Sequence, residues 1–172
     1  MINASDILNA NILIVDDMEA NVQLLQKVLH GAGYLSVSST MIAGEVCKLH
    51  ARDSYDLILL DLQMPGMDGF QIMKGLKELE PDGYLPVIVI TAQPEYKLRA
   101  LEAGARDFVS KPFDVVEVKT RIHNMLEVRL LYKKLAAFNT VLEQTVQERT
   151  AELLASEARY RSLTELASDW YW

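Results

Sequence analysis

The sequence contains very little cysteine and no long apolar run. Cys47 is the single cysteine among 172 residues, so no disulfide can form within the chain, and its place in an apolar helical pattern predicts an unmodified, buried thiol. No stretch approaches the roughly 18 apolar residues of a membrane span, and the N-terminus has no signal-peptide pattern. We therefore expect a cytoplasmic protein with no membrane partner.

Histidine and positive charge are also scarce. The histidines His30, His50 and His123 stand at no metal-ligand spacing, so we interpret them as ordinary side chains. Acidic residues outnumber basic residues by 24 to 17, and the net charge of −7 argues against direct binding of nucleic acid. With 50% hydrophobic and 24% charged residues, the composition is that of a soluble globular protein.

Short apolar runs alternate with helix-length segments in the first two thirds of the chain. The strongest runs are Asn11–Val15, Leu57–Leu60, Val87–Ile90 and Asp107–Ser110, and a weaker one is Leu35–Ser38. Such uniformly apolar runs are typical of strands covered on both faces, as in parallel sheets. The helical periodicity between them predicts successive βα units with right-handed crossovers. The expected fold class is α/β, a doubly wound five-stranded parallel sheet.

Polar residues that can perform chemistry follow four of these strands. They are Asp16 and Asp17, Asp61, Thr91 and Lys111. Because the carboxyl ends of parallel strands line one crevice, we expect these side chains to lie close together. Three carboxylates offset by one lysine repel one another unless a cation intervenes. Mg²⁺, which prefers oxygen ligands, fits such a site.

A carboxylate in this setting can act as a nucleophile. It forms an aspartyl-phosphate when a metal and a cation neutralise the phosphoryl oxygens. Lys111 supplies the positive charge and Thr91 a hydroxyl that can donate to a phosphoryl oxygen. A single Asp at a strand end is more often a helix N-cap, but matching residues at several strand ends favour phosphoryl acceptance, with Asp61 as the acceptor.

The order and spacing of these residues resemble a known family. Asp16-Asp17, the run Asp61–Gly69 (DLQMPGMDG), Thr91-Ala92 and Lys111-Pro112-Phe113 together are similar to the receiver domain of bacterial response regulators, a flavodoxin-like fold, over residues 10–128. The resemblance implies that Asp61 receives phosphate from a histidine kinase or a phosphotransfer protein. It also implies Mg²⁺ bound by Asp16 or Asp17, Asp61 and the backbone carbonyl of Gln63, and a cis peptide bond before Pro112.

The same resemblance implies a conformational switch. On phosphorylation the Thr91 hydroxyl would move toward the phosphoryl group, and the aromatic ring at Phe108 would turn inward. This sequence has Phe108 where tyrosine is common in the family, so packing alone would decide the orientation of the ring. A plain core aromatic is the alternative interpretation of Phe108.

Proline and glycine are absent from Phe113 to the C-terminus, which predicts a helix that starts near Val115 and continues far beyond residue 128. An apolar series spaced 3, 4, 3, 4 runs Val128, Leu131, Leu135, Phe138 and Leu142. This spacing indicates a heptad seam, because apolar residues at these positions face a partner helix. We expect a parallel homodimer through residues 128–163; folding back on the first domain is the alternative.

The heptad pattern changes frame after Leu142. The next apolar residue, Val146, is four positions on where three were due, which is a stutter that locally unwinds a coiled coil. In the new frame Arg149 and Ser156 occupy core positions, so the seam is weak there. Glu148-Arg149-Thr150 resembles the signalling helices that join sensor and output modules in bacteria; a passive spacer is the alternative.

The last residues resemble the opening of a PAS domain, on the basis of Ser156–Leu163 and Ala167–Trp172. We therefore expect a receiver domain at 10–128, a coiled-coil signalling helix at 129–160 and, at 161–172, the beginning of a domain that is incomplete in this chain. Any enzymatic output would lie beyond residue 172, since a receiver catalyses only its own phosphorylation and dephosphorylation.

Two functions follow from this organisation. In the first, phosphorylation of Asp61 biases a dimeric helix that drives an output module absent from the chain. In the second, the protein is a freestanding phosphotransfer or adaptor receiver that acts by protein–protein binding. A phosphatase of the haloacid type is disfavoured, because that family has a second Asp two residues after the nucleophile, where this chain has Gln63.

Overall fold

The computed structural model describes residues 2–81 and 83–168. The strands are β1 (Asn11–Val15), β2 (Ser36–Thr40), β3 (Leu57–Asp61), β4 (Val87–Thr91) and β5 (Asp107–Ser110). The helices are α1 (Ala4–Leu8), α2 (Glu19–Gly31), the 3₁₀ turn η1 (Ala43–Glu45), α3 (Val46–Asp53), α4 (Gly69–Leu79), α5 (Tyr96–Glu102) and α6 (Val115–Ser168).

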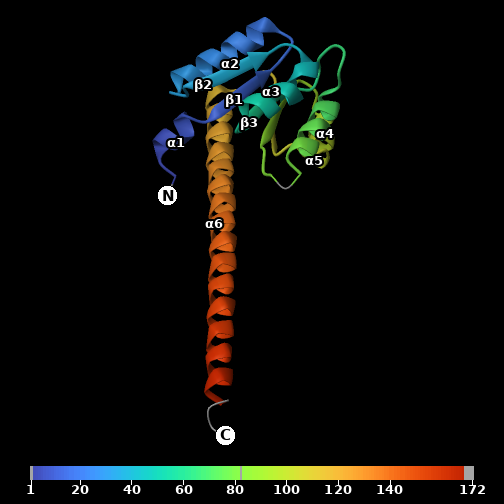
Figure 1. The fold of residues 1–172 in the computed structure, drawn as a ribbon. Coiled ribbons are helices and arrows are strands. Elements are labelled where there is room, and N and C mark those ends of the chain that lie inside the picture. The colour runs from blue at the N-terminus through green and yellow to red at the C-terminus, as the bar shows by residue number, and fades with distance from the viewer. Residues whose placement is uncertain (1, 82, 169–172) are drawn as a thin grey trace. The chain divides into compact units, whose positions relative to one another are not determined.

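The five strands form one parallel sheet in the order β2-β1-β3-β4-β5; Figure 1 labels β1, β2 and β3 of this sheet. The order reverses direction at β1, as in a doubly wound sheet, and a helix connects each pair of consecutive strands. The predicted fold class is therefore confirmed, and so is the long C-terminal helix.

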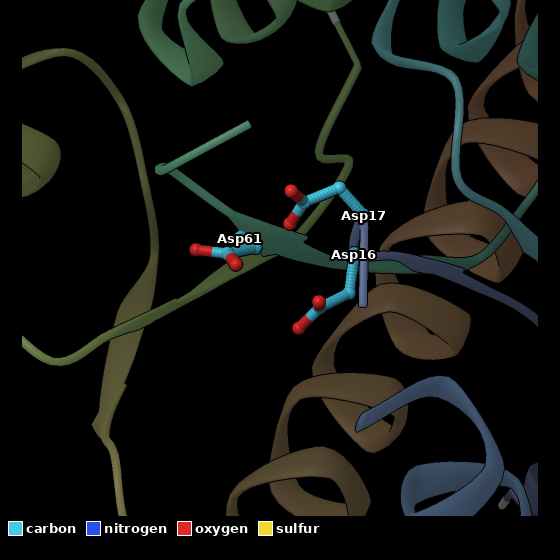
Figure 2. A group of neighbouring side chains, drawn as sticks. All are labelled: Asp16, Asp17 and Asp61. Atoms are coloured by element: carbon cyan, nitrogen blue, oxygen red, sulfur yellow. The ribbon is translucent and has the colours of Figure 1, made fainter. Parts of the chain in front are cut away.

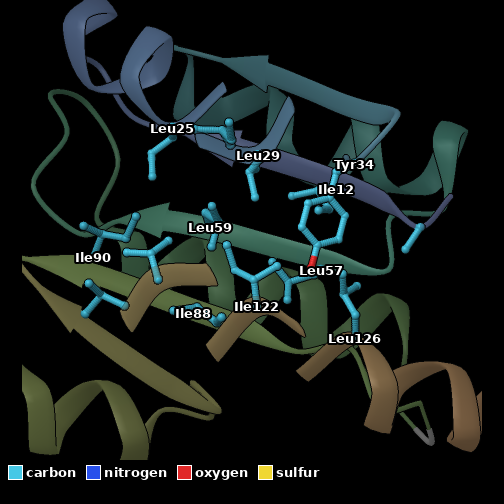
Figure 3. Close-up of a cluster of buried hydrophobic side chains, with 14 of the residues drawn as sticks. Ile12, Leu25, Leu29, Tyr34, Leu57, Leu59, Ile88, Ile90, Ile122 and Leu126 are labelled. Atoms are coloured by element: carbon cyan, nitrogen blue, oxygen red, sulfur yellow. The ribbon is translucent and has the colours of Figure 1, made fainter. Parts of the chain in front are cut away.

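Alternate residues of the central strands face opposite sides of the sheet, and each side has its own core. On one side, strand residues such as Ile12, Leu57 and Leu59 pack with residues of α2 and α6 (Figure 3). On the other, Leu13, Ile58 and their neighbours pack with residues of α3, α4 and α5. All five positions of β3 and of β4 are buried, which explains why both strands are apolar at nearly every position.

The structure corrects three details of the sequence analysis. The weak strand predicted at Leu35–Ser38 lies at Ser36–Thr40, at the sheet edge where much of the strand is solvent-exposed, so its apolar signal is faint. The short helix α1 was not predicted; Ile7 anchors it in the core at 5% exposure. Cys47 is half-buried, contrary to prediction.

The chain divides into two compact units after Tyr132. The helix α6 runs from Val115 to Ser168 without interruption, as the absence of proline and glycine predicts. Within the second unit its apolar side chains, among them Leu135, Phe138 and Leu153, are exposed by 57%, 63% and 69%. Residues 161–168 are helical, and the aromatic residues expected to begin a PAS strand lie outside the described residues. None of the helices in the described part of the chain combines the length and apolar character that a membrane span requires.

Candidate functional site

The polar residues predicted at strand ends do lie at one edge of the sheet. Asp16 directly follows β1, Asp61 ends β3, Thr91 ends β4, and Lys111 directly follows β5. The parallel pairing of β1 with β3 and of β3 with β4 brings these ends into register. The sheet thus brings together at one edge residues that are up to 95 positions apart in the sequence.

Three carboxylates form the acidic side of the site (Figure 2). One oxygen each from Asp16, Asp17 and Asp61 can be chosen so that all three lie within 4.8 Å of one another. Asp16 and Asp61 are buried, at 2% and 4% exposure, while Asp17 is half-buried. Buried carboxylates are costly unless cations or hydrogen-bond donors compensate them.

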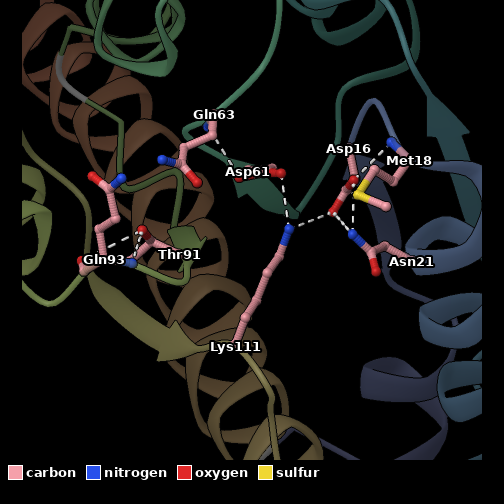
Figure 4. Close-up of polar contacts among 8 residues, drawn as sticks. All are labelled: Asp16, Met18, Asn21, Asp61, Gln63, Thr91, Gln93 and Lys111. Carbon is pink, nitrogen blue, oxygen red and sulfur yellow. Dashed lines mark hydrogen bonds and ion pairs between the residues drawn. The ribbon is translucent and has the colours of Figure 1, made fainter.

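Lys111 supplies one such cation. Its Nζ lies 2.9 Å from Oδ2 of Asp61 and 3.1 Å from Oδ2 of Asp16, and so bridges the two buried carboxylates (Figure 4). Burial lowers the pKa of Lys111, but hydrogen bonds and electrostatic attraction from Asp61 and Asp16 outweigh burial and raise that pKa above its ordinary value of 10.5. Lys111 therefore keeps its positive charge at neutral pH.

The hydroxyl of Thr91 lies beside the site and is almost fully buried, at 1% exposure. Its Oγ1 accepts a hydrogen bond from the backbone N–H of Gln93 at 3.1 Å (Figure 4). The loop after β3 is held similarly, because the backbone N–H of Gln63 donates to Oδ1 of Asp61 at 3.0 Å. Both loops are thus fixed by bonds to the residue that ends the preceding strand.

Glycine is required in the loop between β3 and α4. Gly66 has φ of +87°, which side-chain-bearing residues rarely adopt. At Gly69, the first residue of α4, an added Cβ would lie 2.7 Å from a methyl carbon of Leu62 and 3.0 Å from its Cα, so a larger residue would force Leu62 to shift. The carboxylate of Asp68 then caps α4 by accepting from the N–H of Phe70 at 3.1 Å.

The ring of Phe108 is half-buried and lies near two cations. Nζ of Lys97 is 4.7 Å from the ring centroid, and the guanidinium carbon of Arg121 is 5.9 Å from it. Both distances permit cation–π attraction. The peptide bond between Lys111 and Pro112 is cis, as the family resemblance implied.

The donor set at the acidic side suits a hard divalent cation. Carboxylate oxygens are the ligands that Mg²⁺ prefers, and it commonly completes its shell with water and phosphate oxygens. Three carboxylates and one ammonium leave two negative charges in the site, which one divalent ion would balance. The residues therefore fit Mg²⁺, and a bound ion would neutralise charge on phosphoryl oxygens.

Asn21 belongs to the site although the sequence analysis missed it. Its amide nitrogen lies 3.1 Å from Oδ1 and 3.0 Å from Oδ2 of Asp16 (Figure 4). The sequence feature that could have identified Asn21 is an amide side chain in the first turn of α2, the helix that follows β1. Nothing in the apolar periodicity distinguishes such a residue from a solvent-exposed one.

A second buried polar cluster was also missed. Arg129 of α6 is 6% exposed; it donates to the carboxylate of Glu80 at 2.9 and 3.0 Å and to the carbonyl of Tyr84 at 2.7 Å. Nε2 of His50 lies 2.9 Å from Oε1 of Glu80, and Nδ1 accepts from the N–H of Tyr55. His50, interpreted from the sequence as an ordinary side chain, is thus a buried member of a charged network.

Comparison with known proteins agrees with this geometry. Residues 12–123 match the family model for the response regulator receiver domain. Over 130 residues the chain is 41% identical to the response regulator PleD of Caulobacter vibrioides, and this aligned region covers 74% of this chain and 28% of PleD. Over 115 residues it is 39% identical to the hybrid signal transduction histidine kinase L of Dictyostelium discoideum, covering 63% of this chain and 7% of that protein.

Solved structures show the same fold. A CheY-like response regulator receiver domain protein from Methanospirillum hungatei superposes with a TM-score of 0.64 at 27% identity, over 70% of this chain and 96% of that one. The chain spans less than a third of the length of PleD and of histidine kinase L. The family model covers well over half of the chain and coincides with the sheet that carries the acidic site. The chain belongs to the response regulator receiver family.

Proposed function

We propose that Asp61 accepts a phosphoryl group from the phosphohistidine of a histidine kinase or a phosphotransfer protein. The observation that carries the proposal is the position of the Asp61 carboxylate, 2.9 Å from the ammonium of Lys111 and within the cluster formed with Asp16 and Asp17. The family membership supports it, since receiver domains interact with such donors.

In the proposed transfer an oxygen of the Asp61 carboxylate attacks the phosphorus atom. The phosphorus–nitrogen bond to the donor histidine breaks as the new oxygen–phosphorus bond forms, and its electron pair returns to the imidazole. Lys111, already within hydrogen-bond distance of the acceptor, would follow the incoming phosphoryl oxygens and offset their charge. The Thr91 hydroxyl would exchange its contact with Gln93 for one with a phosphoryl oxygen.

The proposed Mg²⁺ ligands are Asp16, Asp17, Asp61 and the backbone carbonyl of Gln63. When bound, the ion supplies Lewis-acid neutralisation of the phosphoryl group. Asp17 is the most accessible of the three carboxylates and is therefore the one best able to turn toward an ion.

We propose further that α6 carries the phosphorylation state to an output module beyond this chain. The exposed apolar residues of the second unit include Leu142 at 50% and Val146 at 56%, and a helix that exposes such a stripe gains stability by pairing. A parallel homodimer through residues 128–163 would bury it. The proposed organisation is a receiver at 10–128, a signalling helix at 129–160 and the start of a further domain, of PAS type, at 161–172.

Labelling with acetyl phosphate tests the central proposal. The wild-type chain should acquire one phosphoryl group in the presence of Mg²⁺, detected by intact-protein mass spectrometry, and a chelator should prevent it. Asp61→Asn should abolish labelling, because the amide is not a nucleophile. Asp68→Asn is the matched control: Asp68 is exposed on the following loop, and Asn caps α4 equally well. Undiminished labelling of Asp61→Asn would refute the assignment.

A further inference from the structure

Asp16 is held more firmly than any other carboxylate of the acidic site. Its Oδ1 accepts from the backbone N–H of Met18 at 2.9 Å and from the amide of Asn21 at 3.1 Å. Its Oδ2 accepts from the same amide at 3.0 Å and from Lys111 at 3.1 Å. The two oxygens offer about four lone-pair positions, so an ion bound by Asp16 would take the position of the Lys111 contact, while the contacts with Met18 and Asn21 remain.

Asn21 contributes two of the four contacts. Its amide group must point its nitrogen toward Asp16, because both neighbouring atoms are carboxylate oxygens that only accept. Asn21 lies in the first turn of α2, a helix whose buried residues Val22 and Leu25 fix it to the sheet. The amide is therefore anchored by a rigid element and not by a mobile loop.

Asp17 provides the contrast. It belongs to the same carboxylate cluster and is half-buried, yet within residues 2–81 and 83–168 it accepts no hydrogen bond. The site thus pairs one carboxylate that is free to turn with one that is fixed. Fixing Asp16 with a neutral amide keeps the negative charge that a divalent cation requires, whereas a second lysine would cancel it.

We propose that Asn21 is a positioning residue that orients Asp16 and thereby sets the selectivity of this site for Mg²⁺ over larger cations. The proposal rests on the Mg²⁺ site described above. Mg²⁺ demands near-ideal octahedral geometry, while Ca²⁺ accepts longer and irregular coordination. A carboxylate released from Asn21 can rotate, and that freedom penalises the ion with stricter geometry more.

The test compares Mg²⁺ and Ca²⁺ binding to the full chain by isothermal titration calorimetry. Asn21→Ala should weaken Mg²⁺ binding by about 10-fold or more, the usual effect of removing a supporting partner of a metal ligand, and should weaken Ca²⁺ binding by a clearly smaller factor. Gln23→Ala is the matched control, since that amide lies on the same helix but is exposed and bonded to Glu19; both affinities should stay within twofold of wild type. Thermal unfolding verifies that each variant is folded.

The outcomes separate this inference from the function on which it rests. A wild-type chain that binds no Mg²⁺ refutes the metal site itself. A wild-type chain that binds Mg²⁺ while folded Asn21→Ala binds it equally well overturns only the role of Asn21. Equal losses for Mg²⁺ and Ca²⁺ overturn it too, because they show a general loss of charge or structure and no effect on orientation.

Discussion

Replacing Arg129 with methionine should destabilise the receiver unit more than any other single change to a charged residue of α6 in that unit. Methionine keeps much of the length and apolar volume of the side chain but removes the guanidinium. That group makes three hydrogen bonds to Glu80 and the Tyr84 carbonyl, and its Nε lies 3.9 Å from Oδ1 of Asp56.

The magnitude follows from burial. Breaking a buried ion pair by removing one partner costs about 3–5 kcal/mol, because the other charge stays buried and uncompensated. Arg129 has a side-chain exposure of 7%, but Glu80 has 24%, so water can partly rehydrate the remaining carboxylate. We therefore expect about 3 kcal/mol, the lower end of that range. For a unit of this size such a loss lowers the melting temperature by roughly 10 °C.

Arg121→Met is the matched control for this change. Arg121 also lies on α6 and pairs with Asp107 and Glu117, but its side chain is 33% exposed. Exposed pairs contribute about 0–1 kcal/mol, so Arg121→Met should cost at most about 1 kcal/mol. The double variant Arg129→Met with Glu80→Gln should recover part of the loss, since the uncompensated charge of Glu80 is removed and glutamine can still contact His50.

Native-state hydrogen exchange of the β3 and β4 amides measures the effect within the receiver unit of the full chain. These buried strands exchange only on global opening, so their protection reports the free energy of unfolding of that unit. A loss in Arg129→Met no larger than in Arg121→Met would refute the reasoning, as would a double variant that shows no coupling. Either result would mean that the cluster is hydrated and weak despite its burial.

Three further outcomes are expected. Burial raises the pKa of Glu80, but its bonds to Arg129 and His50 outweigh burial and hold that pKa below 4.5. The contribution of Glu80 to the free energy of unfolding should therefore be present above pH 4.5 and be lost as pH falls through the depressed pKa. The Glu80→Gln variant should lack this contribution at every pH. In analytical ultracentrifugation the full chain should sediment as a dimer at micromolar concentration, and a chain ending after Tyr132 should sediment as a monomer. The shorter chain ends at Tyr132 because the receiver unit extends to that residue and includes the buried Arg129. A monomeric full chain would contradict pairing. Arg149 is 79% exposed, pairs with Glu152 and stands at a core position of the second heptad frame, so Arg149→Leu should tighten the dimer by at least about tenfold. The same change should make cysteine crosslinking along residues 128–163, in a background lacking Cys47, insensitive to phosphodonor. Identical crosslinking of the wild-type helix with and without phosphodonor would identify α6 as a passive tether.

The sequence by itself determined the sheet and the edge that carries the chemistry. Almost uniformly apolar runs at β1, β3 and β4 specify strands buried on both faces, and parallel strands necessarily align their carboxyl ends. The order of strands and polar residues along the chain was therefore enough to place Asp61 and Lys111 together. The length of α6 followed from local chemistry as well, because nothing between Val115 and Ser168 interrupts a helix.

Only the tertiary structure decided which polar side chains meet. Glu80 contacts Arg129 across 49 positions and His50 across 30, and all three stand in segments whose apolar pattern is ordinary. Asn21 is close to Asp16 in sequence, but only the packing of α2 on the sheet turns its amide toward that carboxylate. Hydrophobic periodicity fixes which face of an element is buried; the partner of a polar group on that face depends on the distance and angle between elements, which the packed core sets.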